Sequence, residues 1–372
     1  MPRENLLAIE SELRTRYIDR DDEIHGLLLA ALSGQHIELL GPPGTAKSML
    51  AREFCEYVNA RFFSRLMTQY TTPDEVIGPV DIRAYKELGV ARRILTGKVA
   101  DCEVAFLDEV YKAGPAILTC LLTIMQERMY ENDGQPTKCP LLFLIGASNE
   151  LPDENEGLQA LRDRFLLRYN PGWIVDPESF AKLIRLKHGI KLVASVTSDE
   201  LQADQAEAKA LELNDEAADS LNLLWATLKE QGIQCSPRRW RMLQTVMAAE
   251  SWLMGEVEIV AESTIVGCHI LWEKPEQIRV VHQIVSSCIN PSLAKALELK
   301  AAAQEAVAQL HEYSESGELL QALTQLDIML AELRQLKQSG KVATVIAQVA
   351  GFRQQLMLRF LGAAPAETEG AH

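Results

Sequence analysis

Residues 39–48 read Leu39-Leu40-Gly41-Pro42-Pro43-Gly44-Thr45-Ala46-Lys47-Ser48 and stand between two regular segments. They begin within an apolar run, residues 37–40, which predicts a strand, and residues 49–55 after them predict a helix. Strand, glycine-rich loop and helix, in this order, form the context that a phosphate-binding loop requires. The segment therefore predicts backbone N–H groups that surround an anion at the N-terminal end of a helix.

The side chains of this loop fit a nucleotide with a metal ion. Gly41 and Gly44 let the chain curl, Lys47 can reach the β- and γ-phosphates, and Ser48 offers Mg²⁺ a hydroxyl. Ala46 stands where the strict motif has its second glycine. The residues expected to contact the nucleotide are Gly41, Pro42, Pro43, Gly44, Thr45, Ala46, Lys47, Ser48 and Met49. The alternative is a Gly/Pro turn before a helix, with a stray lysine.

Two further strands are expected to end in polar groups at the same edge of a sheet. Asp108 and Glu109 follow the apolar run 104–107. Asn149 stands at the end of a third strand, which starts with the apolar run 141–145. We expect Asp108 to bind the metal with Ser48, and Glu109 to accept a proton from the attacking water. Asn149 can hydrogen-bond a γ-phosphate oxygen and the water. Alone, each is weaker evidence, and Asn149 by itself reads as a turn residue.

Two arginines are candidates for stabilising charge on a transferring phosphoryl group. Arg164 follows the third strand and its helix, on the flank away from the loop, so we expect it to serve a neighbouring subunit. Arg238 opens a helix further along the chain and is expected to report nucleotide state. Taken singly, an arginine at either position is more often a surface ion-pair partner.

Composition limits the class of protein. The 372 residues suggest two or three domains, and 37 Lys+Arg against 52 Asp+Glu give a formal net charge of -15. An acidic chain without long basic runs is a poor binder of nucleic acid, so no such partner is expected. Seven scattered cysteines indicate reduced thiols, and no run is long enough for a membrane span. The chain is expected to be cytoplasmic.

The order of segments predicts an α/β domain followed by helices. Strands and helices alternate up to about residue 190, which is typical of a doubly wound, mostly parallel sheet. Two insertions, residues 78–95 and 128–139, are predicted to be β-hairpins. In the first, Lys86, Arg92 and Arg93 are expected to be exposed charges without packing roles, which face a ring axis or a client.

Three domains are expected: residues 1–190, the nucleotide domain; residues 191–290, an all-α lid reached through a polar link at 197–214; and residues 291–372, a helical bundle or hairpin. Leucines spaced four and three apart predict one buried stripe within this last domain, more often intramolecular than an oligomer zipper. They are Leu319, Leu323, Leu326, Leu330 and Leu333. Residues 363–372 are expected to be disordered.

Taken together, the segments 41–48, 106–109, 147–150, 163–165 and 236–240 resemble those of the AAA+ ATPases, and within them the MoxR group, where Ala46 in place of glycine is common. The likeness extends over roughly residues 1–290 and is strongest to the RavA branch of that group. The resemblance implies an ATP-driven hexamer with sites between subunits and a partner containing a von Willebrand factor A domain. It also implies that residues 78–95 are the helix-2 insert and residues 128–139 the presensor hairpin. After Pro291 the chain departs from that branch, because the β-rich insertion found there is absent, so binding of an amino-acid decarboxylase is not implied.

The expected function is hydrolysis of Mg-ATP coupled to remodelling or chaperoning of a partner complex, with an unidentified client protein. The alternative is a nucleotide-gated scaffold that switches partners with little turnover. Glu109 and Arg164 favour the enzyme, because a pure binding switch could lack both.

Overall fold

The computed structural model describes residues 2–152, 156–186, 194–289, 291–308, 310, 316–336 and 340–363. The chain forms two compact units, the first comprising residues 1–218 and 234–278 and the second residues 219–233 and 279–372. Each unit is described by itself below.

A five-stranded parallel sheet forms the centre of the first unit, in the order β3-β4-β7-β1-β8. Its strands are β1 (His36–Leu40), β3 (Phe62–Leu66), β4 (Val104–Asp108), β7 (Phe143–Ser148) and β8 (Phe165–Tyr169). β1, β7 and β8 are buried along their whole length, as strands of a sheet covered on both faces must be. The strand order reverses beside β1, so the loop after this strand lies where open α/β sheets bind ligands.

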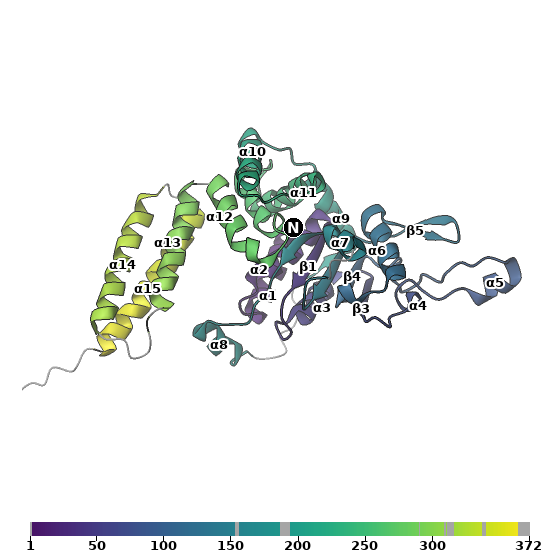
Figure 1. The fold of residues 1–372 in the computed structure, drawn as a ribbon, viewed down its shortest axis with the longest axis horizontal. Coiled ribbons are helices and arrows are strands. Elements are labelled where there is room, and N and C mark those ends of the chain that lie inside the picture. The colour runs from purple at the N-terminus through teal and green to yellow at the C-terminus, as the bar shows by residue number, and fades with distance from the viewer. Residues whose placement is uncertain are drawn as a thin grey trace, which may run out of the picture. The chain divides into compact units, whose positions relative to one another are not determined.

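Helices cover both faces of the sheet, which confirms the doubly wound fold (Figure 1). On one face the Phe54 ring of α3 packs edge-on against Phe143 of β7, with ring centroids 6.2 Å apart. On the other face Leu121 belongs to one buried cluster with Ala105 and Leu144. The helices of this part are α1 (Pro2–Arg16), α2 (Asp21–Ser33), α3 (Lys47–Tyr57), α4 (Pro73–Val76), η1 (Val110–Lys112), α6 (Pro115–Glu127), α7 (Glu156–Arg164) and α8 (Pro177–Leu183).

The second insertion is the β-hairpin that the sequence predicts. β5 (Met129–Asn132) and β6 (Gln135–Lys138) pair antiparallel. Asp133 and Gly134 form its turn with φ of 54° and 72°, the two left-handed residues that a tight hairpin turn needs.

The hairpin predicted for the first insertion is wrong. One antiparallel bridge joins Val80 to Arg93, and a helix, α5 (Ile82–Leu88), lies between the two arms. The Asp81 carboxylate accepts hydrogen bonds from two N–H groups of the first turn, and Gly89 ends the helix with φ of 69°. These capping signals favour a helix over extended pairing. Figure 1 shows α5 at the end of an arm that extends away from the sheet.

Two of the charges expected to be free on this arm have packing roles instead. Arg92 donates to the Asp81 carboxylate, with Nη2 and Oδ2 3.1 Å apart. Arg93 pairs with Asp74 and donates to the Gly78 carbonyl, which places the arginine at the base of the arm. Lys86 and Arg92 are exposed, as predicted, whereas Arg93 is half-buried, and the expectation that these arginines lack packing roles is wrong.

The polar segment 197–214, predicted to be a link, is mostly a packed helix, α9 (Ser198–Lys209). Thr197 and Glu200 form a capping box at its start, and the Gln205 side chain donates to the Ala31 carbonyl of α2. Just before it, β9 (Val196–Thr197) pairs with β2 (Val58–Asn59), so the segment expected to be all α also has a short strand. The first unit therefore continues past the predicted boundary near residue 190.

The elements described between α9 and residue 289 are helices, apart from one isolated bridge between Leu213 and Ile259. They are α10 (Asp215–Glu230), α11 (Pro237–Met254), η2 (Ala261–His269), η3 (Pro275–Gln277) and α12 (Ile278–Ile289). α11 packs against α2 and α9. Among the described residues of the whole chain, no helix is both long and apolar enough to span a bilayer.

The second unit contains a bundle of α13 (Pro291–Ala308), α14 (Ser316–Gln335) and α15 (Gly340–Ala363). All five leucines of the predicted stripe are buried inside this bundle, which confirms intramolecular packing. No strand occurs in the described part of these helices and their connections. Of the tail predicted to be disordered, residues 363–372, Ala363 is the last residue of α15, and residues 364–372 lie outside the described residues.

Candidate functional site

The loop after β1 adopts the curled backbone that its sequence predicts. Gly44 has φ of 82°, and a Cβ on Gly41 would lie 2.4 Å from the Pro171 carbonyl oxygen, so both positions need glycine. The Gly41 N–H donates to the Ser148 carbonyl over 3.1 Å and fixes the loop to β7. Ala46 is left-handed, with φ of 65°, a conformation that costs an alanine about 1 kcal/mol more than a glycine.

Helix α3 begins directly after this loop and presents an uncapped N-terminus. Ala46 is its N-cap residue, no side chain caps the first turn, and that turn contains no acid. Free N–H groups at a helix N-terminus carry a partial positive charge and bind anions such as phosphate. The loop therefore fits the phosphates of a nucleotide.

Lys47 lies folded over the loop. It is 7 % exposed, and its Nζ donates to the Pro42 carbonyl over 2.9 Å and to Asn149 Oδ1 over 3.0 Å. Burial lowers the pKa of this ammonium, against the opposing effect of the nearby Asp108 and Glu109 carboxylates. The cation thus stands at the strand ends, beside the loop and both acids.

The predicted metal ligands lie next to each other. Ser48 Oγ donates to Asp108 Oδ2 over 2.8 Å, although the two residues are sixty positions apart. A hydroxyl beside a carboxylate is the oxygen donor set that suits Mg²⁺ in nucleotide sites. The two residues present therefore fit this ion.

Glu109 and Asn149 complete the cluster. Glu109 has φ of 51°, and its Oε1 accepts a hydrogen bond from Asn149 Nδ2. Its other oxygen, Oε2, pairs with Lys112 Nζ at 3.2 Å. The Asn149 amide accepts from Lys47 and donates to Glu109, which fixes its orientation. Five predicted residues from three strand ends are thereby joined by direct contacts: Lys47, Ser48, Asp108, Glu109 and Asn149.

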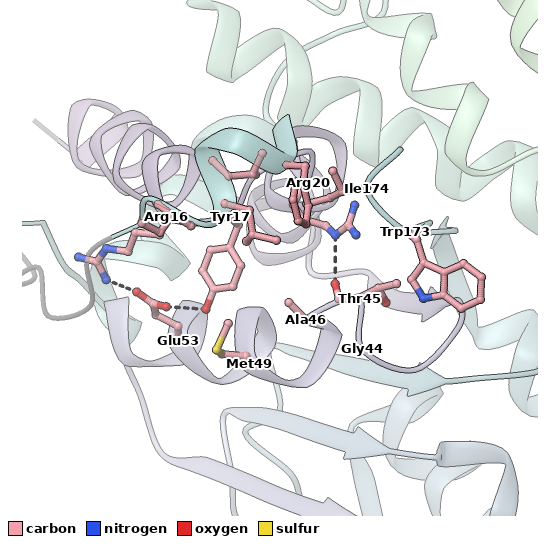
Figure 2. A pocket seen from close by; sticks show the side chains of 14 residues that line it. Arg16, Tyr17, Arg20, Gly44, Thr45, Ala46, Met49, Glu53, Trp173 and Ile174 are labelled. Carbon is pink, nitrogen blue, oxygen red and sulfur yellow. Dashed lines mark hydrogen bonds and ion pairs between the residues drawn. The ribbon is translucent and has the colours of Figure 1, made fainter. Parts of the chain in front are cut away.

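A cavity of about 620 Å³ adjoins the loop (Figure 2). It is lined by Arg16, Tyr17, Ile18, Arg20, Gly44, Thr45, Ala46, Met49, Glu53, Trp173, Ile174, Phe180, Leu183 and Leu186. Aromatic and aliphatic side chains at one end of a phosphate loop suit a planar base. Met49, predicted from its place after the motif, contributes to this wall.

Sequence reasoning missed the residues that support the loop from this side. Arg20 Nε donates to the Thr45 carbonyl over 3.0 Å (Figure 2), and its guanidinium also donates to the Gly172 carbonyl. Trp173 Nε1 donates to the Pro43 carbonyl over 3.3 Å. The sequence offered one signal for Arg20, the predicted break between two helices at residues 17–20. Nothing in the local sequence shows that this break packs against the phosphate loop.

The two candidate arginines are not brought to the loop by any described contact. Arg164 donates to the Ala160 carbonyl over 3.1 Å and to Gln126 Oε1 over 2.7 Å. Arg238 Nη1 lies 3.9 Å from Asp163 Oδ2. Neighbouring Arg162, in contrast, is 5 % exposed and faces the interior.

Comparison with known proteins identifies the family. Residues 4–213, more than half of the chain, match the family model described as the MoxR domain in the MoxR-vWA-beta-propeller ternary systems. An uncharacterized protein of Methanocaldococcus jannaschii is 31% identical over 366 residues, which covers 94% of this chain and 98% of that protein. Chaperone MoxR1 of Mycobacterium tuberculosis is 30% identical over 179 residues, 46% of this chain and 45% of MoxR1.

A solved structure shows the same fold. It is that of a Cytophaga hutchinsonii protein named as an inferred ATPase, with a TM-score of 0.60 and 18% identity, and covers 77% of this chain and 94% of that one. The family model, together with the strand order and the loop geometry, leads to one conclusion: the chain belongs to the MoxR family of AAA+ ATPases.

Proposed function

We propose that this protein hydrolyses ATP with Mg²⁺ and uses the cycle to remodel or chaperone a partner complex. The observation that carries the proposal is the contact chain at the sheet edge, which joins Lys47, Ser48 and Asp108 to Glu109 and Asn149. These are the residue types that phosphoryl transfer to water requires: a lysine for the phosphates, a hydroxyl and a carboxylate for the metal, and a carboxylate and an amide for the water.

Each side chain has a role that follows from its place. The loop N–H groups and Lys47 bind the phosphates, and Ser48 and Asp108 would hold Mg²⁺. The ion, when bound, neutralises charge on the phosphate oxygens. Glu109 accepts the proton of the attacking water, which Asn149 orients. Contributions from Arg164 of a neighbouring subunit, and from Arg238 as a nucleotide contact, are part of the proposal.

The assembly is also proposed. A ring, most simply a hexamer, would place Arg164 of one subunit beside the nucleotide of the next. The name of the matching family model supports a partner with a von Willebrand factor A domain. The narrower likeness to the RavA branch rests on the sequence resemblance and stays within this proposal, as does a cytoplasmic location.

A specific observation favours the alternative, a nucleotide-gated switch with little turnover. Both oxygens of the Glu109 carboxylate are engaged, one by Asn149 and the other by Lys112. These contacts compete with a water for the Glu109 carboxylate, so they favour slow turnover in this conformation. Turnover therefore separates the two functions.

The test compares Lys47→Ala and Glu109→Gln with the wild-type protein. We expect Lys47→Ala to abolish ATP binding, because it removes a phosphate contact. Glu109→Gln should bind ATP normally but lower the hydrolysis rate by about 10² or more, because only the base is lost. Glu150→Gln, an exposed acid next to Asn149, is the matched control and should hydrolyse ATP at the wild-type rate. ATP binding by a wild-type protein that shows no turnover would establish the switch instead.

A further inference from the structure

Glu38 occupies an unexpected place in the middle of β1. The strand reads His-Ile-Glu-Leu-Leu, and Glu38 is fully buried. A central strand of a parallel sheet is normally apolar, and a buried carboxylate is costly unless charges or hydrogen bonds compensate it. The groups that contact the Glu38 carboxylate must therefore offset the cost of its burial.

These partners lie on η1, α7 and β8. Arg168 Nε, in β8, is 3.8 Å from Glu38 Oε2, and η1 and α7 adjoin or contain proposed catalytic groups. The Tyr111 hydroxyl, in η1, donates to Glu38 Oε1. The Arg162 guanidinium, in α7, lies with Nε 3.6 Å from Glu38 Oε2. Tyr111 follows Glu109 by two residues, and Arg162 precedes Arg164 by two. Glu38 itself stands two residues before the end of the strand that leads into the phosphate loop.

The same cluster continues towards α11. Glu273 Oε2 lies 2.8 Å from Arg168 Nη1 and 3.6 Å from Arg162 Nη1, and its Oε1 lies 3.2 Å from Arg239 Nη1. The three arginines are 5 % exposed or less. Asp163 extends the cluster, because its carboxylate lies 3.6 Å from Arg239 Nε and 3.9 Å from Arg238 Nη1.

Stability alone is a poor explanation for this arrangement. Buried ion pairs are often no more stable than apolar residues of similar size. The Arg162–Glu38 pair is also longer than a hydrogen bond, and Arg162 Nε and Nη2 have no hydrogen-bond partner among the described residues. The Arg162 side chain is thus held by charge without a fixed hydrogen-bond geometry, while the Arg162 carbonyl accepts a hydrogen bond from Arg168 Nη2 over 3.2 Å, so the end of α7 is fastened to this cluster.

We propose that Glu38, Tyr111 and Arg162 are positioning residues that set α7, and with it Arg164, relative to the acids and the phosphate loop. The inference rests on the proposed ATPase function. Glu38 is the centre of the arrangement, because it contacts both the element after Glu109 and the helix that ends at Arg164. The subunit's own site and the arginine that it offers to a neighbour are thereby adjusted together.

Tyr111→Phe provides the first test, because it removes one hydroxyl and keeps the ring. We expect the turnover number to fall at least tenfold while the ATP dissociation constant stays within twofold. The matched control is Tyr57→Phe, which removes another buried tyrosine hydroxyl bonded to a carboxylate, Glu12 Oε2 at 3.0 Å, outside this cluster. The control should lose comparable thermal stability and keep its turnover.

Glu38→Gln is the second variant, since its amide can still accept from Tyr111 but no longer attracts Arg162. Hydrogen–deuterium exchange supplies a readout that does not need turnover: amides of residues 156–164 should exchange several-fold faster in both variants and at the wild-type rate in Tyr57→Phe. The inference is overturned if both variants hydrolyse ATP at the wild-type turnover number and the amides of residues 156–164 exchange at the wild-type rate. If the wild-type protein does not hydrolyse ATP, the proposed function fails, and unchanged exchange in α7 would still refute the positioning role.

Discussion

His25 lies between two carboxylates that come from different helices. Its Nδ1 is 2.9 Å from Glu10 Oε1 of α1, and its Nε2 is 2.7 Å from Glu250 Oε2 of α11. Burial by itself lowers the pKa of His25, but the hydrogen bonds and charges of the two carboxylates outweigh it and raise the pKa from 6.5 to about 10. The imidazolium therefore joins three helices of the first unit at neutral pH.

The pH dependence of stability follows from this shift. A group whose pKa rises on folding stabilises fully below its unfolded value, here near 6.5, and loses that contribution as pH rises through about 10. We predict that His25→Gln destabilises the protein by roughly 3 kcal/mol at pH 6, since it removes the imidazolium charge that both carboxylates contact. Denaturant unfolding of both proteins from pH 6 to pH 10.5 measures this difference, which should shrink as the pH rises. A difference that stays constant with pH would show that the imidazolium charge is not responsible.

At the scale of elements, one side chain joins the two insertions of the first unit. Asn132, at the end of β5, accepts the Arg93 N–H at 2.7 Å and donates to the Arg93 carbonyl at 3.1 Å. The Asn132 side chain therefore connects the β5–β6 hairpin to the arm that carries α5. It bonds to both backbone polar groups of Arg93, as a neighbouring strand would. We infer that the two insertions move as one element.

We predict that Asn132→Ala releases the arm. The loss of two hydrogen bonds should cost about 1–2 kcal/mol locally, and amides of residues 80–93 should exchange with deuterium several-fold faster while those of β1 are unchanged. Asn132→Asp keeps the acceptor and loses the donor, so it should give an intermediate effect. Equal exchange of the arm in all three proteins would contradict the coupling.

At the scale of the whole molecule, the proposed site is shared between subunits. Arg164 bonds only to α6 and α7 among the described contacts, so its charge is placed away from its own phosphate loop. An arginine supplied in trans is worth roughly 10³–10⁵ in rate in related phosphoryl transfers. We predict that Arg164→Ala nearly silences hydrolysis while each subunit still binds ATP.

Mixing two silent variants tests the sharing directly. Subunits with Lys47→Ala retain Arg164, and subunits with Arg164→Ala retain the loop, so some interfaces of a mixed assembly are intact. Hydrolysis should partly return on mixing, once exchange of labelled subunits has been demonstrated. With exchange established, a mixture no more active than its parents would argue that Arg164 acts in its own chain or that all sites must be intact. Arg162 is a poor substitute, because it is buried against Glu38 and Glu273.

The sequence by itself determined the phosphate loop, the alternation of strands and helices in a mostly parallel sheet, and the polar groups at the strand ends. These features are local: Gly41 and Gly44 specify the backbone, an apolar run specifies a buried strand, and parallel strands place their carboxyl ends at one edge. The contacts among Lys47, Ser48, Asp108, Glu109 and Asn149 follow from that edge. The leucine stripe of α14 was predictable for the same reason, because helical spacing alone aligns it.

Only the tertiary structure decided which distant residues meet. Glu38 reads as an irregularity in an apolar strand until Tyr111 and Arg162 pack against it, and Arg20 gains its role only when α2 returns to the loop. The helix α5 replaced an expected hairpin, because local capping by Asp81 outweighed weak pairing of the arms. The physical reason is common to all three: a charge or a backbone group is satisfied by whichever partner folding brings near, and the separation between partners along the chain leaves no local pattern.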